Sequence, residues 1–411
     1  MECLTVRTGY KLMWAGLLSW LLIFGGYLTR AHAHCAGNHT GSHPHCSGGE
    51  PPASAMKQEI VTVQPAAKQR EQIVIMNADG TDVQVVLVSE RFARFFGVSW
   101  SGDGSKILFR GEINGQAGIY WIKVFNLDGT GNRTGFAPGQ PVFVSSTLTA
   151  DPHARWSPKK APDGKEWIAY YDTTDPEWQM WLVNPYSPSE KVPLASPNGW
   201  HEYQPSWSPA ADRIVFLSYP SDGSCLCPGD IQILELGKDA SGKIEVQNRV
   251  SLIVENPYLN DGPGTLKNYL ASQHFFEVDW ANKGEWIIPR ISPVSGLWAF
   301  PADPTQVEPK AKDITNDPEL SYLRAVWSPS DNALLFTRDG FGGVCAVPDN
   351  NDDPALQGGP SSVVMAPLVT DSQGEIVKLD ICKATAKLSW LTRYSYGWWR
   401  GGSGVLPPFA P

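Results

Sequence analysis

Ser206-Trp207-Ser208-Pro209 is the stretch that decides the fold of this 411-residue chain, because similar stretches return along the sequence. Some copies repeat Trp-Ser-Pro in full, and others keep only the tryptophan. The copies are centred on Trp100, Trp156, Trp207, Trp280, Trp327 and Trp390. These tryptophans lie 47 to 73 residues apart. A unit repeated at this length is a supersecondary element that buries its apolar face only against its neighbours, so the sequence predicts a repeat protein.

The residues after each tryptophan indicate what one unit looks like. After Trp207, a polar turn at Pro209–Asp212 leads into the apolar run Arg213–Leu217. Short β-branched and aromatic runs bounded by Gly, Pro and Asp are typical of strands joined by hairpins. We therefore expect an all-β chain, folded as a six-bladed β-propeller of four-stranded antiparallel blades. Each tryptophan would lie on an inner strand and pack between adjacent blades.

The Trp-Ser-Pro motif, followed by a polar turn and a β-branched strand, resembles the TolB-like repeat, a WD40-like propeller repeat of the PD40 type. The resemblance covers about residues 71–395. The repeat occurs in the periplasmic protein of the Tol system and in the propellers of prolyl oligopeptidase-like enzymes. In the Tol protein an α/β domain precedes the propeller. Only about residues 34–70 are available for such a domain in this sequence, so we expect a propeller without the N-terminal TolB domain.

Residues 1–33 have the composition of a secretory signal peptide. A basic start with Arg7 and Lys11 precedes 17 mostly apolar residues at 12–28, and a small-x-small exit ends at Ala33. The alternative is an uncleaved N-terminal anchor, which would be the protein's only contact with a membrane. We therefore expect a periplasmic or secreted protein.

Residues 34–70 are poor in large apolar side chains and are predicted to form a flexible linker. The His- and Cys-containing stretch His34–Cys46 could capture zinc or copper, or could instead contain a Cys35–Cys46 disulfide. The absence of a standard zinc spacing favours the disulfide. Six cysteines follow the signal segment, an even number that fits disulfides of undetermined pairing: Cys35, Cys46, Cys225, Cys227, Cys345 and Cys382.

The two ends of the repeat array are each incomplete. A predicted hairpin at 72–88 precedes the first tryptophan motif, whereas little chain follows the last one. We expect this hairpin to complete the sixth blade, and the Gly- and Pro-rich residues 396–411 to form a loose tail. Two long insertions are expected, at 237–267 and 348–374. Function tends to concentrate in such insertions on a rigid scaffold.

Three positions before the tryptophans stand Gly97 in the first unit and polar residues in the other five. Strand alternation sends this row to the channel side of the inner strands, opposite the apolar row next to it. The resulting candidate ligand site at the channel mouth consists of His153, Gln204, Glu277, Arg324 and Lys387. His201 and His274, six residues before their tryptophans, could join His153 to hold a divalent metal; no other cofactor is expected. The alternative is that these residues merely line a wet channel.

The charge and motif content limit the function. A net charge of −9 with interspersed acidic and basic residues argues against nucleic-acid binding. The sequence contains no Gly-x-Ser-x-Gly elbow and no P-loop. Two hypotheses remain. The first is an exported, non-enzymatic TolB-like propeller that binds a protein partner or acts as a scaffold in the cell envelope. The alternative is a carbohydrate lyase or hydrolase with a His-lined metal site.

Overall fold

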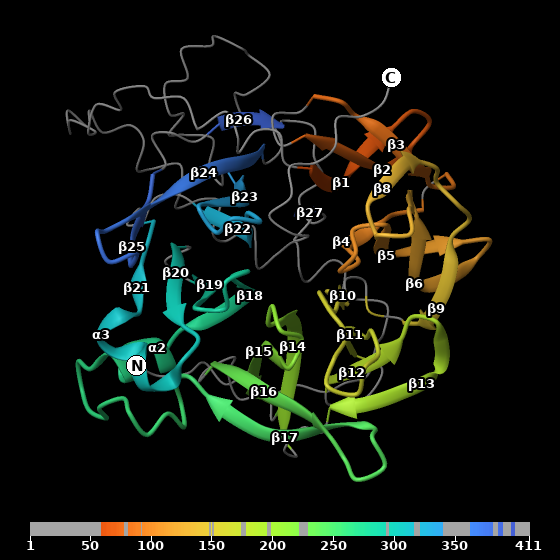
Figure 1. The fold of residues 1–411 in the computed structure, drawn as a ribbon. Helices are drawn as coiled ribbons and strands as arrows, with labels where there is room; N and C mark the ends of the chain where they lie inside the picture. The colour runs from red at the N-terminus through yellow and green to blue at the C-terminus, as the bar shows by residue number, and fades with distance from the viewer. Residues whose placement is uncertain are drawn as a thin grey trace, which may run out of the picture.

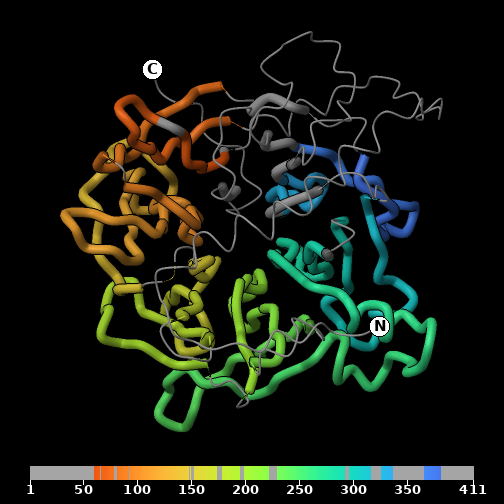
Figure 2. Tube along the Cα trace, turned by 180° about the vertical axis from the view of Figure 1, so that it is seen from behind, coloured from red at the N-terminus to blue at the C-terminus, as the bar shows by residue number. Residues whose placement is uncertain are grey.

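Six antiparallel sheets surround a common axis in the computed structural model, as seen from the front in Figure 1 and from behind in Figure 2. The structure describes residues 59–77, 81–91, 93–147, 149, 152–173, 178–194, 199–221, 229–292, 296–315, 321–339, 362–380, 385–388 and 396–398. The predicted all-β, six-bladed propeller is confirmed.

Each blade has four strands, which follow one another from the axis outward (Figure 1). Blade 1 contains β4 Phe96–Trp100, β5 Lys106–Ile113, β6 Gln116–Lys123 and β9 Val142–Ser146. Blade 2 contains β10 Arg155–Trp156, β11 Ile168–Asp172, β12 Gln179–Asn184 and β13 Ser187–Leu194. Blade 3 contains β14 Trp200–Trp207, β15 Arg213–Pro220, β16 Asp230–Lys238 and β17 Ile244–Ser251.

The second half of the ring follows the same order. Blade 4 contains β18 His274–Trp280, β19 Trp286–Ser292, β20 Gly296–Pro301 and β21 Lys312–Asp313. Blade 5 contains β22 Ser321–Trp327, β23 Ala333–Asp339, β24 Ser362–Thr370 and β25 Ile376–Leu379. Blade 6 contains β27 Tyr396–Trp398, β1 Glu59–Ala66, β2 Arg70–Asn77 and β3 Gln84–Val88.

The remaining elements are small. The hairpin β7 Phe125–Leu127 and β8 Arg133–Phe136 is inserted between β6 and β9. The helices among the described residues are α2 Leu266–Ala271, the 3-10 turn η1 Pro304–Gln306 and α3 Val307–Lys310. An additional strand, β26 Thr385–Leu388, pairs with β24.

The serine after the tryptophan explains why the motif recurs. In blade 3, Ser208 Oγ accepts the Arg213 N–H at 3.0 Å and donates to Asp212 Oδ1 at 2.9 Å. Ser328 of blade 5 repeats both contacts, to the Ala333 N–H at 3.1 Å and to Asn332 at 3.0 Å. The hydroxyl thus holds the tight turn into the second strand, where a buried backbone N–H needs an acceptor.

The tryptophans fill the space between blades. Trp207, Trp280 and Trp327 are at most 1% exposed. The indole N–H of Trp327 donates to the carbonyl of Asp279 in the preceding blade, at 3.3 Å. Burial of these large rings and satisfaction of the indole N–H together join neighbouring blades.

Blade 6 is built from both ends of the described chain. β27 pairs with β1 through Ile60↔Trp398 and Thr62↔Tyr396, and β1 pairs with β2 along its whole length. β2 and β3 form the hairpin that was expected at 72–88, and they do complete the sixth blade. The N-terminal end supplies three strands, rather than the expected two.

The third of these strands corrects one expected boundary. β1 lies inside the segment 34–70 that composition indicated as a linker, so the propeller starts at Glu59 and not at 71. Ile60, Val61 and Val63 are fully buried. The composition of the whole segment, dominated by His, Gly, Ser and Pro, concealed a local β-branched run.

The last blade corrects a second expectation. β26, directly before the motif at Trp390, pairs with β24 of blade 5 instead of forming the inner strand of blade 6. That inner strand is β27, in the segment expected to be a loose tail. Trp390 itself, residues 399–411, the signal segment and all the cysteines lie outside the described residues.

Candidate functional site

The inner strands share a backbone irregularity three residues before their tryptophans. Positive φ angles occur at Gly97 (60°), His153 (44°), Gln204 (58°) and Glu277 (52°). In blades 1, 3, 4 and 5 the register against the second strand shifts at this point. Residues with a Cβ rarely adopt positive φ. A repeated bulge, and not simple strand alternation, therefore sets the direction of these side chains.

The bulges bring His153, Gln204 and Glu277 of three successive blades into one row. Gln204 Oε1 accepts the backbone N–H of Glu277, and Gln204 Nε2 lies 3.2 Å from His153 Nε2. A backbone N–H only donates, so the amide oxygen of Gln204 faces Glu277 and its NH₂ group faces the histidine. His153 Nε2 must then accept, which assigns the proton of the neutral ring to Nδ1.

The space beside this row is small. Together with Arg155 and Asp279, the row lines a cavity of about 10 Å³. That is about the space needed by one water molecule. A cavity of this size admits water but no sugar ring. A larger cavity, of about 60 Å³, lies at the tryptophan ends of the inner strands and is lined by Trp100, Trp156, Trp207 and Trp327 among others.

Two members of the predicted channel site do not join the described row. Lys387 belongs to β26, which pairs with β24, so its backbone is not part of an inner strand. Arg324 lies in β22 at the same bulge position as Gln204, but its side chain is outside the described part of the structure. The ligand-binding role of the five residues remains a prediction.

The three histidines do not converge on one point. Within the described ranges, no three His, Cys, Asp or Glu side chains are close enough to hold a metal ion. His201 Nδ1 instead accepts the Trp178 N–H at 3.0 Å, and its ring packs 5.0 Å from that of Trp178. His274 packs against Phe276, and burial lowers the pKa of its imidazole. A site that joins His153, His201 and His274 on one metal is therefore not formed.

A better-defined feature is the insertion Leu252–Gln273 between β17 and β18. The sequence placed an insertion at 237–267, but Gly237 belongs to β16 and residues 244–251 form β17. Leu252, Ile253, Leu259 and Leu270 of the insertion are buried in the core shared by blades 2 to 4. The other expected insertion, 348–374, contains β24; its residues 348–361 are outside the described set.

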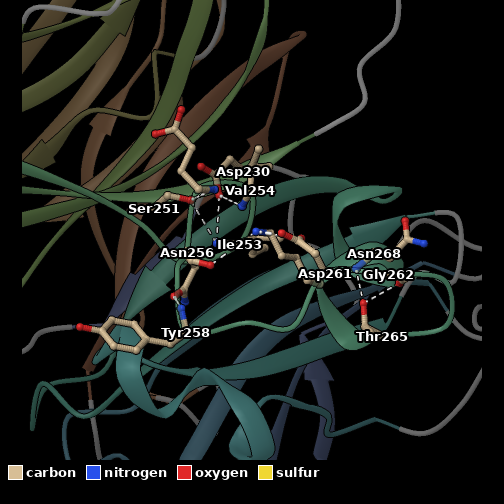
Figure 3. Close-up of polar contacts among 12 residues, drawn as sticks. Asp230, Ser251, Ile253, Val254, Asn256, Tyr258, Asp261, Gly262, Thr265 and Asn268 are labelled. Carbon is tan, nitrogen blue, oxygen red and sulfur yellow. Dashed lines mark hydrogen bonds and ion pairs between the residues drawn. The ribbon is translucent and has the colours of Figure 1, made fainter.

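Asp230 anchors the start of the insertion (Figure 3). Its fully buried carboxylate accepts the N–H groups of Ile253 and Val254 through Oδ1, both at 3.2 Å, and the amide of Gln232 through Oδ2 at 3.0 Å. Burial raises the pKa of Asp230 to about 6, against the opposing effect of these hydrogen bonds and one from Ser251. The contacts connect the first strand residue of β16 to a segment more than 20 residues later.

Asn256 provides a second anchor (Figure 3). Its side chain is fully buried and donates to the carbonyls of Leu252 and Pro304, both at 3.0 Å, while its Oδ1 accepts the Tyr258 N–H at 2.9 Å. Pro304 belongs to η1, in the connection between β20 and β21. One asparagine therefore holds the insertion to blade 4 and also orients the backbone of Tyr258.

The insertion presents aromatic side chains to solvent. Tyr258 is 60% exposed and Tyr269, on α2, is 41% exposed. Tyr269 packs partly against Trp298, with ring centroids 5.9 Å apart. Tyrosine combines a large apolar area with a polar group and loses little conformational entropy when it binds. A rigid segment with such residues exposed has the properties of a contact surface.

The chain is similar to several solved structures. It is similar to TolB from Acinetobacter baumannii, with 13% identity, coverage of 84% of this chain and 67% of that one, and a TM-score of 0.47. For the putative TolB from Agrobacterium tumefaciens the identity is 14%, the match covers 78% of this chain and 88% of that one, and the TM-score is 0.44. The six-bladed architecture is consistent with a TolB-like propeller. No protein-family model and no curated protein matches the chain.

The chain is also similar to a solved structure of a hydrolase. A puromycin hydrolase has 15% identity and a TM-score of 0.43, with coverage of 82% of this chain. The present chain spans 47% of the length of that hydrolase. At such identities and TM-scores the likeness indicates nothing about activity. None of the helices in the described ranges is long and apolar enough to cross a lipid bilayer.

Proposed function

We propose that this chain is an exported, non-enzymatic propeller that binds another protein in the cell envelope through the insertion Leu252–Gln273. The observation that carries the proposal is the combination of buried anchors and exposed aromatics within one short segment. Asp230 and Asn256 fix its backbone, and Tyr258 and Tyr269 remain in solvent. Energetically important contacts at protein interfaces are enriched in tyrosine on a preorganised backbone. Export is supported by the composition of residues 1–33.

The alternative of a carbohydrate lyase or hydrolase has less support. In the row His153–Gln204–Glu277, the side chain of Gln204 is engaged by His153 and by the Glu277 N–H, beside a cavity of about 10 Å³. Catalysis at this row would need both a metal and space for a substrate. Among the described residues no three His, Cys, Asp or Glu side chains could hold a metal ion, and the cavity beside the row is about 10 Å³.

Site-specific photo-crosslinking in cells that naturally express the chain tests the proposal. p-Benzoylphenylalanine replaces Tyr258 in one variant and Tyr186 in the control. Tyr186 is similarly exposed, at 54%, but lies in blade 2 between β12 and β13. We expect a covalent adduct with one defined protein from position 258 and none from position 186. No adduct at 258, or the same set of adducts at both positions, would refute the insertion as the docking surface.

A further inference from the structure

We propose that the partner of the insertion Leu252–Gln273 presents arginine or lysine side chains to it. This inference rests on the proposed protein-binding function and adds the chemistry of the partner. It follows from how the insertion distributes its charges and aromatic rings between solvent and the core.

The anionic and the cationic side chains of the insertion differ in their exposure to solvent. Both of its carboxylates, Glu255 and Asp261, are exposed, and the side chain of Asp261 is 81% exposed. Its one cationic side chain, Lys267, is only 14% exposed; it pairs with Asp261 at 3.0 Å and lies 3.5 Å from the Asn256 carbonyl. Because Lys267 offsets Asp261, Glu255 leaves the insertion with a net charge of −1, within a chain of net charge −9.

The aromatic rings of the insertion complement the same kind of partner. An ammonium or guanidinium group is attracted to the face of an aromatic ring, most strongly when water is excluded. Tyr258 lies between Glu255 and Asp261 in the sequence, and Tyr269 follows Lys267, so both exposed rings are close in sequence to these charges. The chain already uses this contact internally, since the Arg213 guanidinium lies 4.9 Å from the Trp280 ring centre and that of Arg249 lies 5.2 Å from Phe216.

The backbone that carries these groups is fixed before binding. Ser251 Oγ accepts the Glu255 N–H at 2.9 Å, and Asn256 Oδ1 accepts the Tyr258 N–H at the same distance. Thr265 caps α2, which carries Tyr269, by accepting the Asn268 N–H. Little ordering entropy then opposes association.

The other occupants are disfavoured by charge. Nucleic acids and anionic lipid surfaces carry phosphates, which the exposed carboxylates repel. A symmetric contact with a second copy of this chain would place Glu255 and Asp261 near identical carboxylates, and like charges in an interface oppose binding. A basic protein surface is the occupant that both the carboxylates and the tyrosines favour.

Fluorescence anisotropy with the full chain tests the inference. The probe is a labelled peptide with four arginines separated by Gly-Ser, and its counterpart carries neutral citrulline at the same positions. We expect the arginine peptide to bind, and the citrulline peptide to bind at least tenfold more weakly. Tyr258→Ala and Glu255→Gln should each weaken binding of the arginine peptide several-fold, with a loss that shrinks at high salt for Glu255→Gln. The double variant Glu255→Gln/Asp261→Asn should weaken it about tenfold.

The control is Glu112→Gln/Glu245→Gln, which removes two exposed carboxylates elsewhere in the propeller. It should bind the arginine peptide as the unaltered chain does. Because Asp261→Asn also removes the Lys267 partner, the single variant Glu255→Gln separates lost charge from a disturbed insertion. Equal binding of both peptides, or equal weakening by the control, would overturn the inference. If the crosslink from position 258 forms and survives Glu255→Gln/Asp261→Asn unchanged, the protein-binding function stands and the basic partner does not.

Discussion

Trp207 donates its indole N–H to the backbone carbonyl of Arg155, 3.0 Å away in the preceding blade. Trp207 is also 1% exposed, so its ring and its hydrogen bond both hold blade 3 against blade 2. We expect Trp207→Ala to lower the free energy of unfolding by about 3–5 kcal/mol, because it leaves a large cavity and an unpaired carbonyl. Trp207→Phe should cost less, since it keeps most of the ring. Urea denaturation of both variants measures the difference. Because both variants lose the hydrogen bond to Arg155, equal costs would show that the size of the ring contributes nothing.

Titration of the Asp230 carboxyl should make the free energy of unfolding depend on pH in the acidic range. Burial raises the pKa of Asp230 from 3.8 to about 6 in the folded protein. Between these values the folded state keeps the proton that the unfolded state has lost, so stability falls as the pH rises from 4 to 6. The full effect is on the order of 3 kcal/mol, from a shift of about two pKa units.

Asp230→Asn removes this titration and serves as the reference. The difference in unfolding free energy between the two proteins should change across pH 4–6 and be flat above pH 7. Chemical denaturation at each pH measures it. Parallel curves across the whole range would show that Asp230 does not titrate there.

Substitution of Val61 tests how much the strand β1, which pairs with β27 to close the ring, contributes to stability. Val61 is fully buried opposite Gly397 of β27, whereas Val83, just before β3, is 49% exposed. Val61→Ala should lower the free energy of unfolding by about 2 kcal/mol, and the matched Val83→Ala by less than about 0.5 kcal/mol. Thermal and urea unfolding of the pair give the comparison. A similar small effect at both positions would mean that blade 6 contributes little to the stability of the ring.

Gln204 tests the row at the channel mouth. Gln204→Leu removes the acceptor for the Glu277 N–H and the donor for His153 Nε2. Unsatisfied buried polar groups should lower stability by about 1–3 kcal/mol. In the unaltered protein, NMR of labelled histidine should report the neutral His153 ring with its proton on Nδ1. A ring protonated on Nε2 would contradict the assigned orientation of Gln204.

The repeated tryptophan motif predicted the fold well because its contacts lie within one hairpin or between neighbouring blades. Ser208 acts within its own hairpin and Trp207 needs only the preceding blade, so the spacing of the copies was enough to predict the blades, although the copy at Trp390 does not provide the inner strand of the sixth. Strand alternation also placed His153, Gln204 and Glu277 side by side, although the bulge that orients them has no sequence signature in these non-glycine residues.

The insertion was only partly predictable, because its limits depend on long-range contacts. Residues 239–243 fall inside the insertion expected at 237–267, yet Asp239 Oδ1 closes a tight hairpin there by accepting the Ser241 and Lys243 N–H groups. The true insertion begins after Ser251 and is held by Asp230, 23 residues before Ile253. The failure of the predicted histidine site has a similar cause, since His201 bonds to Trp178, a residue that no periodicity connects to it.

The pairing of Ile60 with Trp398 has a consequence for biosynthesis. These partners are separated by more than 300 residues of chain, roughly the whole ring, so β27 is translated after the other strands that the structure describes. Until then the nascent chain has five blades and three strands of the sixth, which lacks its inner strand. Contacts of such long range also form slowly. A chain released before β27 is made would keep an unpaired strand edge that other proteins or proteases could bind. Completion of the ring therefore depends on this single three-residue strand.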